Sequence, residues 1–137
     1  MTKVKQLTAW VDSRPGELGR IADALAKAKV NISAVTCWSA GGENPVHLVV
    51  SSPSRAKKVL LDLGVRLTEE EVLRIKVPDK LGALADLAVR LGAGNINIEY
   101  AYSTVPAEGS EAELVLSLSD MAGALKILHG KSDSSSK

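Results

Sequence analysis

The chain has 137 residues, of which 45% are hydrophobic and 24% charged, and its formal net charge is +1. A net charge this close to zero argues against electrostatic binding to nucleic acid or to anionic membranes. Aromatic residues make up 3% of the chain, so they provide few surfaces for base stacking. One cysteine, the lack of a signal-like N-terminal apolar run and the absence of a ~20-residue apolar span predict a cytoplasmic protein that binds neither nucleic acid nor membranes.

The first predicted elements are a strand and a helix. Lys5–Val11 alternates apolar and polar side chains, which is typical of a half-buried strand. Ser13 is a suitable helix N-cap, and Pro15 suits the first helical turn. The apolar face of this helix is predicted to consist of Leu18, Ile21, Ala22 and Leu25.

Two strands, a second helix and a short strand follow. A strand starts at Val30 and another spans Val46–Ser51. The second helix opens at Pro53 and is predicted to end at Gly64, because glycine is common just past helix ends. Val65–Leu67 offers a short fourth strand. The resulting order, β-α-β-β-α-β, is that of ferredoxin-like folds.

The same pattern recurs 66 residues later, which indicates a duplication. Residues 11–64 align with 77–130 without a gap. The matched positions include Gly16 with Gly82, Leu25 with Leu91, Asn31 with Asn97, Leu48 with Leu114 and Gly64 with Gly130. In the second repeat we expect a strand over Glu71–Val77, an N-cap at Asp79, a strand from Ile96, a turn over Pro106–Ser110, a strand over Ala112–Leu118 and a helix that ends at Gly130.

The second repeat lacks a counterpart of the fourth strand. The sequence KSDSSSK is too polar to pack, so residues 131–137 are predicted to be a disordered tail. Arg74–Val77 is then expected to be an unpaired sheet edge, which favours pairing with the other repeat or another chain. We predict domains at 1–68 and 69–130, and a homo-oligomer, because domains of about 65 residues are marginal alone.

Catalytic chemistry is poorly supported by the sequence. His47 and His129 belong to no nucleophile or metal-ligand pattern, and Cys37 is expected to be a small buried side chain in an apolar strand. An RNA-recognition module would share the element order but would need aromatic residues on its central strands, where Trp10 stands alone. We expect no enzyme activity, no metal and no cofactor.

The turn before the first helix of each repeat is the candidate binding site. A helix N-terminus presents free N–H groups and positive partial charge, which suit a carboxylate, and Gly16 and Gly82 allow close approach. Asn31 and Asn97 each add a donor and an acceptor. This combination suits an amino acid or similar zwitterion. The residues alone leave open a structural role, in which polar side chains cap the helices and the glycines form the turns.

The segments SRPGELGRIADALAKAKVNI and PDKLGALADLAVRLGAGNINIEY resemble the ACT domain family, which comprises small-molecule-binding regulatory modules of amino-acid metabolism. The resemblance covers residues 3–130 and is to stand-alone tandem ACT proteins. It implies an α+β fold of two ferredoxin-like βαββαβ domains, the second lacking its last strand, with ligands held at interfaces between ACT units. The contact residues that it implies are Ser13, Arg14, Pro15, Gly16, Glu17, Leu18, Asn31 and Ile32, and in the second repeat Asp79, Lys80, Leu81, Gly82, Ala83, Leu84, Asn97 and Ile98.

Two residues depart from the family pattern. Leu81 replaces the usual proline, and Ser13 stands where serine-sensing relatives have asparagine, so serine specificity does not follow. The first repeat, with Arg14, is expected to suit a carboxylate better than the second, where Asp79 competes for the helix amides. The function implied is that of a regulatory or sensor protein that binds an amino acid and either acts on a separate metabolic enzyme or transporter, or buffers or senses a metabolite. The alternative is a protein–protein interaction or oligomerisation module with vestigial pockets.

Overall fold

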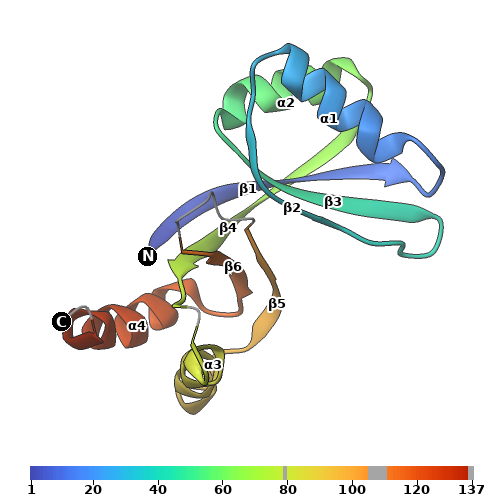
Figure 1. Ribbon diagram of the computed structural model, residues 1–137. Helices are drawn as coiled ribbons and strands as arrows, with labels where there is room; N and C mark the ends of the chain where they lie inside the picture. Colours follow the sequence, from blue (N-terminus) through green and yellow to red (C-terminus); the bar gives the residue numbers. More distant parts are fainter. Residues whose placement is uncertain (79, 105–110, 136–137) are drawn as a thin grey trace. The chain divides into compact units, whose positions relative to one another are not determined.

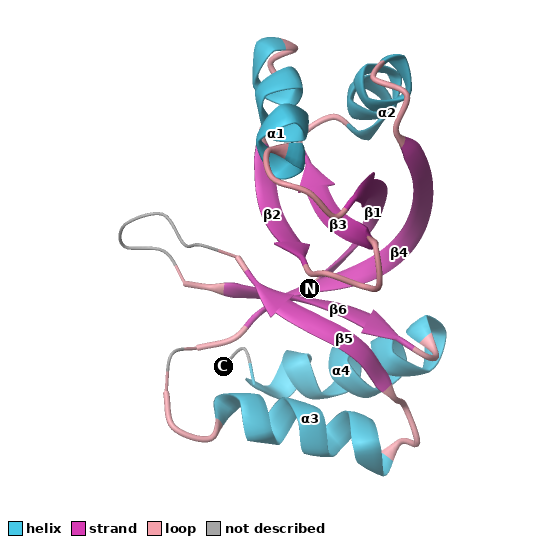
Figure 2. Ribbon diagram, turned by 90° about the vertical axis from the view of Figure 1, so that its right-hand side faces the viewer, coloured by secondary structure: helices cyan, strands magenta, loops and turns pink. Residues whose placement is uncertain are grey.

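The computed structural model describes residues 1–78, 80–104 and 111–135. The chain divides into two compact units: the N-unit, Val4–Glu71, and the C-unit, which combines Met1–Lys3 with Val72–Lys137. In each unit, two helices cover one face of an antiparallel sheet (Figures 1 and 2). The elements are β1 (Thr2–Asp12), α1 (Glu17–Lys27), β2 (Ile32–Cys37), β3 (Glu43–Val50), α2 (Pro53–Asp62), β4 (Arg66–Lys76), α3 (Ala83–Ala93), β5 (Ile98–Ser103), β6 (Glu113–Leu118) and α4 (Met121–Ser135).

The N-unit has the strand order β2-β3-β1-β4, with α1 and α2 on the apolar face. The predicted alternation of β1 is confirmed, because Leu7, Ala9 and Val11 are buried toward the helices. Leu7 pairs with Leu48 of β3, and both are fully buried. The rest of this core comes from Ile21, Leu25, Val30, Val46, Val50, Ala56, Leu60 and Val65.

The C-unit repeats this arrangement, with the strand order β1-β4-β6-β5. Leu73 of β4 pairs with Leu116 of β6, and neither side chain is exposed. The helices α3 and α4 bury their apolar stripes against these strands. The core consists of Leu73, Leu87, Leu91, Ile96, Leu116, Ala124 and Leu128.

Two long strands, β1 and β4, each contribute residues to both units. The sequence suggested separate strands at Val65–Leu67 and Glu71–Val77, but one strand of 11 residues runs over Arg66–Lys76. No glycine or proline interrupts this stretch, so nothing forces a turn. The predicted open edge at Arg74–Val77 was also wrong, since β4 lies between β1 and β6. Met1–Lys3 belongs to the C-unit, and β1 follows β4 in the order where a fourth strand was expected.

The duplication is not free of gaps, as the strand registers show. Leu7 and Leu73 are 66 positions apart, whereas their partners Leu48 and Leu116 are 68 positions apart. Two additional residues therefore lie between β5 and β6, in the region of the predicted turn 106–110, which is outside the described residues. Sequence identity alone could not detect them, because alternating apolar strands tolerate a shift of two residues without changing faces.

The end of α4 differs from the prediction for the same reason. With the corrected spacing, Gly130 is equivalent to Asp62 in α2 rather than to Gly64. Gly64 has a φ of +79° and follows the end of α2, whereas α4 continues past Gly130 to Ser135. The region 131–137, predicted as a disordered tail, includes the last turn of α4 over 131–135, and residues 136–137 lie outside the described residues.

The helix starts are also set by glycine rather than by a polar cap. Ser13 is not the N-cap of α1, because Gly16, with a φ of 90°, occupies that position, and no side chain caps the helix. Gly82 does the same before α3, with a φ of 86°. The left-handed backbone at these positions suits glycine, which has no Cβ to clash. Asp79, the predicted N-cap of the second repeat, lies outside the described residues.

Candidate functional site

In the N-unit, the turn before α1 carries a carboxylate from the chain itself. Glu17 is 8% exposed. Its Oε1 lies 3.0 Å from Arg20 Nη2, and its Oε2 lies 3.2 Å from Arg14 Nε. These hydrogen bonds hold the pKa of Glu17 below its ordinary value, and the bond from Arg20 has a larger effect than the bond from Arg14. The two cations that could attract a ligand carboxylate therefore already contact Glu17.

The other predicted residues of the first repeat fall into two separate groups. Ser13, Pro15, Gly16 and Leu18 surround the turn and are exposed. Ser13 Oγ lies 3.3 Å from Ser39 Oγ. Ile32 packs against the core, and the backbone N–H of Asn31 donates to Ser51 Oγ at 2.9 Å.

Within one unit, the asparagine and the glycine turn lie at opposite ends of the sheet. The Ser13 N–H donates to the Gly42 carbonyl, just before β3, while the Asn31 carbonyl accepts from the Ser51 N–H, just after it. The 8 residues of β3 separate these points by about 26 Å. In the C-unit, Asn97 likewise bonds to Ser119, beyond the far end of β6. One small ligand cannot contact both groups in the same unit.

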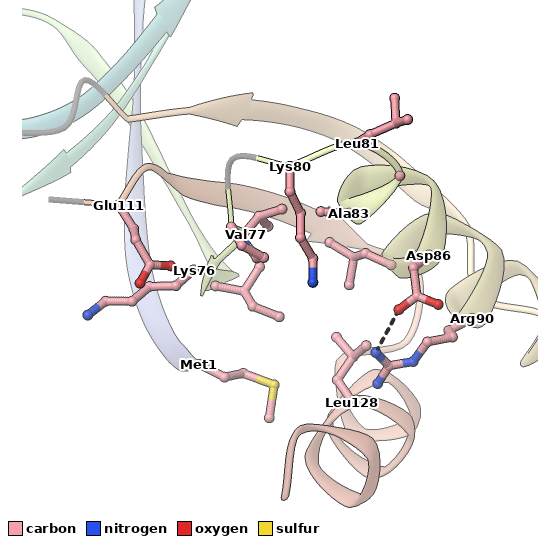
Figure 3. A pocket seen from close by; sticks show the side chains of 14 residues that line it. Met1, Lys76, Val77, Lys80, Leu81, Ala83, Asp86, Arg90, Glu111 and Leu128 are labelled. Carbon is pink, nitrogen blue, oxygen red and sulfur yellow. Dashed lines mark hydrogen bonds and ion pairs between the residues drawn. The ribbon is translucent and has the colours of Figure 1, made fainter. Parts of the chain in front are cut away.

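The C-unit has an open pocket of about 840 Å³ beside the turn that precedes α3 (Figure 3). Of the residues predicted for the second repeat, Lys80, Leu81, Gly82 and Ala83 line it, although the Leu81 side chain points away from the cavity. Leu84 is exposed outside the lining, and Asn97 and Ile98 do not contribute to it. The remaining lining residues are Met1, Ile75, Lys76, Val77, Pro78, Asp86, Leu87, Arg90, Glu111 and Leu128.

Charged groups of both signs face this pocket. The Lys80 ammonium extends into the cavity, and Arg90 and Asp86 lie across from it on α3 (Figure 3). Arg90 Nη1 is 3.5 Å from Asp86 Oδ2, whereas Arg90 Nη2 is buried and has no hydrogen-bond partner among the described residues. Lys76 and Glu111 flank the opposite side. No side chain of a described residue caps α3, and its N-terminus adds positive partial charge.

Comparison with known proteins identifies the family. A family model described as "ACT domain pair" matches residues 1–127. This chain belongs to that family. The crystal structure of protein BT0572 from Bacteroides thetaiotaomicron is 30% identical, with a TM-score of 0.87 over 95% of this chain and 89% of that one. The ligand-free regulatory subunit of aspartate kinase from Thermus thermophilus shares the fold, with 13% identity and a TM-score of 0.65 over 92% and 90% of the two chains. Comparison with curated proteins gives no match.

The two repeats of this ACT domain pair differ at the positions that matter for the pocket. Ala83 occupies the position of Glu17, so the second repeat has no equivalent internal carboxylate. Arg90 occupies the position of Ala24, so its cation is specific to the second repeat. Sequence reasoning missed Arg90 because it stands among apolar residues of a helix. The signal that could have found it is its spacing from Ala83, seven residues earlier on the same helical face.

His47 and Cys37 are the two residues with reactive side chains whose surroundings in the ACT domain pair can be compared with the prediction. His47 is 6% exposed; its Nδ1 lies 2.7 Å from Thr8 Oγ1 and 3.1 Å from Gln6 Nε2. Cys37 is exposed, not buried as expected, because its side chain alternates with that of buried Ala34 along β2. Among the described ranges, no cluster of His, Cys, Asp and Glu could hold a metal ion.

Acidification is expected to destabilise the fold through His47. Burial lowers the pKa of His47 from its ordinary value of 6.5, although Glu70 acts in the opposite direction. Below pH 6.5 the unfolded chain therefore takes up a proton that the folded chain does not. Above pH 6.5 the contribution of His47 to the free energy of unfolding is fully present. As the pH is lowered below 6.5, this contribution falls by at most about 1.4 kcal/mol per pH unit, until the pH passes the pKa of His47 in the folded state. Thermal unfolding at a series of pH values should show this slope.

The matched comparison uses the two histidines of the chain. His47→Leu should flatten the slope between pH 6.5 and the folded pKa, whatever its effect on stability at neutral pH. His129→Gln, at an exposed position, should retain it. An unchanged slope in the His47 variant would assign the acid sensitivity to other groups.

The outer face of α3 is apolar and exposed. Leu84 is 57% exposed and Val89 is 68% exposed. The helical spacing places Ala85, Ala88 and Gly92 on the same face, which contains no charged residue. By contrast, α1 presents charged pairs to solvent, such as Asp23 with Lys27 at 2.9 Å.

Across the described residues, no helix has both the length and the apolar character to cross a membrane.

Proposed function

We propose that this ACT domain pair binds an amino acid or a similar zwitterion in the C-unit pocket and thereby regulates a separate metabolic enzyme, without catalysing a reaction itself. The observation that carries the proposal is a cavity of about 840 Å³ in which cations and carboxylates face one another above an apolar floor. Pockets of this size, mostly apolar and with a few convergent polar groups, are typical of small-molecule sites.

The α-carboxylate of the ligand would bind at the start of α3. Lys80 supplies a full positive charge there, and the helix N-terminus, which no described side chain caps, supplies N–H donors. In the N-unit the corresponding region is occupied by Glu17, which bonds to Arg14 and Arg20. Because Ala83 replaces that glutamate in the second repeat, the corresponding position is open to the carboxylate of a ligand. This makes the second repeat, rather than the first, the better candidate.

The ammonium group of the ligand would bind to the carboxylates of the pocket. Asp86 and Glu111 both line the cavity, from α3 and from the segment before β6. Asp86 Oδ2 also lies 3.5 Å from Arg90 Nη1. A zwitterion satisfies both signs at once, whereas a simple anion or cation would leave one set of charges partly desolvated without a partner.

Thermal unfolding against a panel of the natural amino acids tests the proposal. A ligand present at about 100 times its Kd should stabilise the folded protein by about 2.7 kcal/mol. For a chain of this size, that corresponds to a rise in Tm of several degrees. Lys80→Ala should reduce the rise. Lys58→Ala, at an exposed position of α2 in the N-unit, is the matched control and should leave it unchanged. A panel without any response contradicts the proposal.

The apolar face of α3 supports a second function, association of two copies. Two copies can pair this face about a two-fold axis without bringing like charges together, because the face is uncharged. Ala85, Ala88 and Gly92 permit close approach of the helices, and Leu84 and Val89 supply apolar area. This role is compatible with ligand binding, since the pocket lies on the opposite side of α3, at Ala83, Asp86 and Arg90.

Val89→Glu is therefore expected to convert a dimer into a monomer. Placing a carboxylate on each copy in the middle of the paired face adds repulsion and desolvation cost. Sedimentation velocity over a range of concentrations measures the result. Lys27→Glu, an exposed charge change on α1, serves as the control and should leave the dimer intact. A monomeric wild-type chain would contradict this second function but not the first.

A further inference from the structure

We infer that the ligand of the C-unit pocket is an acidic amino acid, with a second carboxylate on its side chain that pairs with Arg90. This inference rests on the proposed function and names the ligand class for the same site. Its basis is the incomplete hydrogen bonding of the Arg90 guanidinium.

Arg90 is a partly buried cation whose donors are only partly used. Its side chain is 19% exposed, and its Nη2 is buried without an acceptor among the described residues. Its contact with Asp86, at 3.5 Å, is long for a charge-assisted hydrogen bond and involves Nη1. A buried donor without a partner costs about 1–3 kcal/mol, and more when it is charged. Nη2 itself has almost no accessible surface, so a ligand would reach Arg90 at the exposed part of the guanidinium, where the contact with Asp86 is long. The site therefore favours a ligand that brings a strong acceptor to that exposed part.

A ligand with an apolar side chain would not satisfy this requirement. It could cover Leu87 and Leu128, which also line the pocket, but it would exclude water from the exposed part of the Arg90 guanidinium without supplying an acceptor. A side-chain carboxylate supplies two acceptor oxygens and matches the planar guanidinium. The amide of asparagine or glutamine supplies one neutral acceptor and adds two donors, which Arg90 cannot accept.

The charges of the pocket agree with a ligand of net negative charge. Among the described lining residues, Lys76, Lys80 and Arg90 contribute three positive charges, and Asp86 and Glu111 contribute two negative charges. An acidic amino acid carries two carboxylates and one ammonium, so its net charge of about −1 complements the net positive charge of these residues. Lys80 and Arg90 approach the cavity from two directions, so each can hold one carboxylate (Figure 3). In the N-unit no such pair exists, because Ala24 replaces Arg90.

Calorimetric titration of the full chain with L-aspartate, L-glutamate, L-asparagine and L-glutamine tests the inference. At least one acid should bind at least about 10-fold more tightly than its own amide, since the two differ in one charge-assisted interaction. Arg90→Gln should weaken binding of that acid by about 10- to 100-fold and remove the preference for it over the amide. Arg55→Gln, an exposed arginine of α2 in the N-unit, should leave both unchanged.

The outcomes separate this inference from the proposed function. If an amide or an apolar amino acid such as L-leucine binds as tightly as both acids, the inference is wrong while amino-acid binding stands. Persistence of the acid preference in a folded Arg90→Gln variant also overturns it. If no natural amino acid binds, both fail. The wild-type comparison of acid with amide needs no variant, so it holds even if Arg90→Gln does not fold.

Discussion

Leu116→Ala is expected to lower the free energy of unfolding by about 2–5 kcal/mol. Leu116 is fully buried in β6 and pairs with Leu73 of β4, which is also fully buried. Truncation removes apolar contacts and leaves a cavity in the middle of the C-unit core. Because domains are stable by only about 5–15 kcal/mol, the loss should be large enough to measure by urea unfolding followed by circular dichroism.

The control for this prediction is a leucine that does not belong to either core. Leu61 of α2 is 60% exposed, so Leu61→Ala should change stability by no more than about 0.5 kcal/mol. Similar losses for the two variants would show that the side chain of Leu116 is not packed as described.

Arg74→Pro is expected to prevent stable folding, with a loss comparable to the roughly 3 kcal/mol or more that proline costs inside a helix. Arg74 lies within β4, which has a neighbouring strand on each side. Proline removes a backbone donor and is accommodated in sheets chiefly at edges or bulges. Circular dichroism and the urea midpoint should show the loss directly.

Arg74→Val separates the backbone effect from the loss of the side chain. Arg74 pairs with Glu113 at 3.0 Å, and both side chains are about three-quarters buried. Valine removes this ion pair but suits a strand, so we expect a much smaller loss than with proline. A proline variant as stable as the valine variant would contradict a central position for β4.

The family, the duplication and the α+β class could be predicted because they depend on local signals. Glycine at 16 and 82 is required by a left-handed backbone, and the motifs around these residues occur twice. Apolar residues such as Ile21 and Leu87 then recur at helical spacing and are buried as expected. These signals require only a few neighbouring residues, so a single sequence reveals them.

The pocket could not be predicted because it depends on residues that are distant in the sequence. Met1, Arg90 and Leu128 meet only after the C-unit has formed, and no motif links them. The exposure of Cys37 could not be predicted for a related reason. Alternation shows that a strand has two faces, but it does not show which face is covered. The distance of Asn97 from the turn before α3 could not be predicted either, because the pattern shows that a strand starts near Asn97 but not at which end of the sheet it starts.

The division of β1 and β4 between the two units bears on how this protein can evolve. Met1–Lys3 comes from the start of the chain but belongs with Val72–Lys137, so a recombination point at the sequence boundary of the repeats would deprive the later half of its first strand segment. The later half alone is therefore not a complete unit. Exchange between relatives should preserve the pair as one heritable block, and later specialisation should proceed by point substitution, as at Ala83 and Arg90.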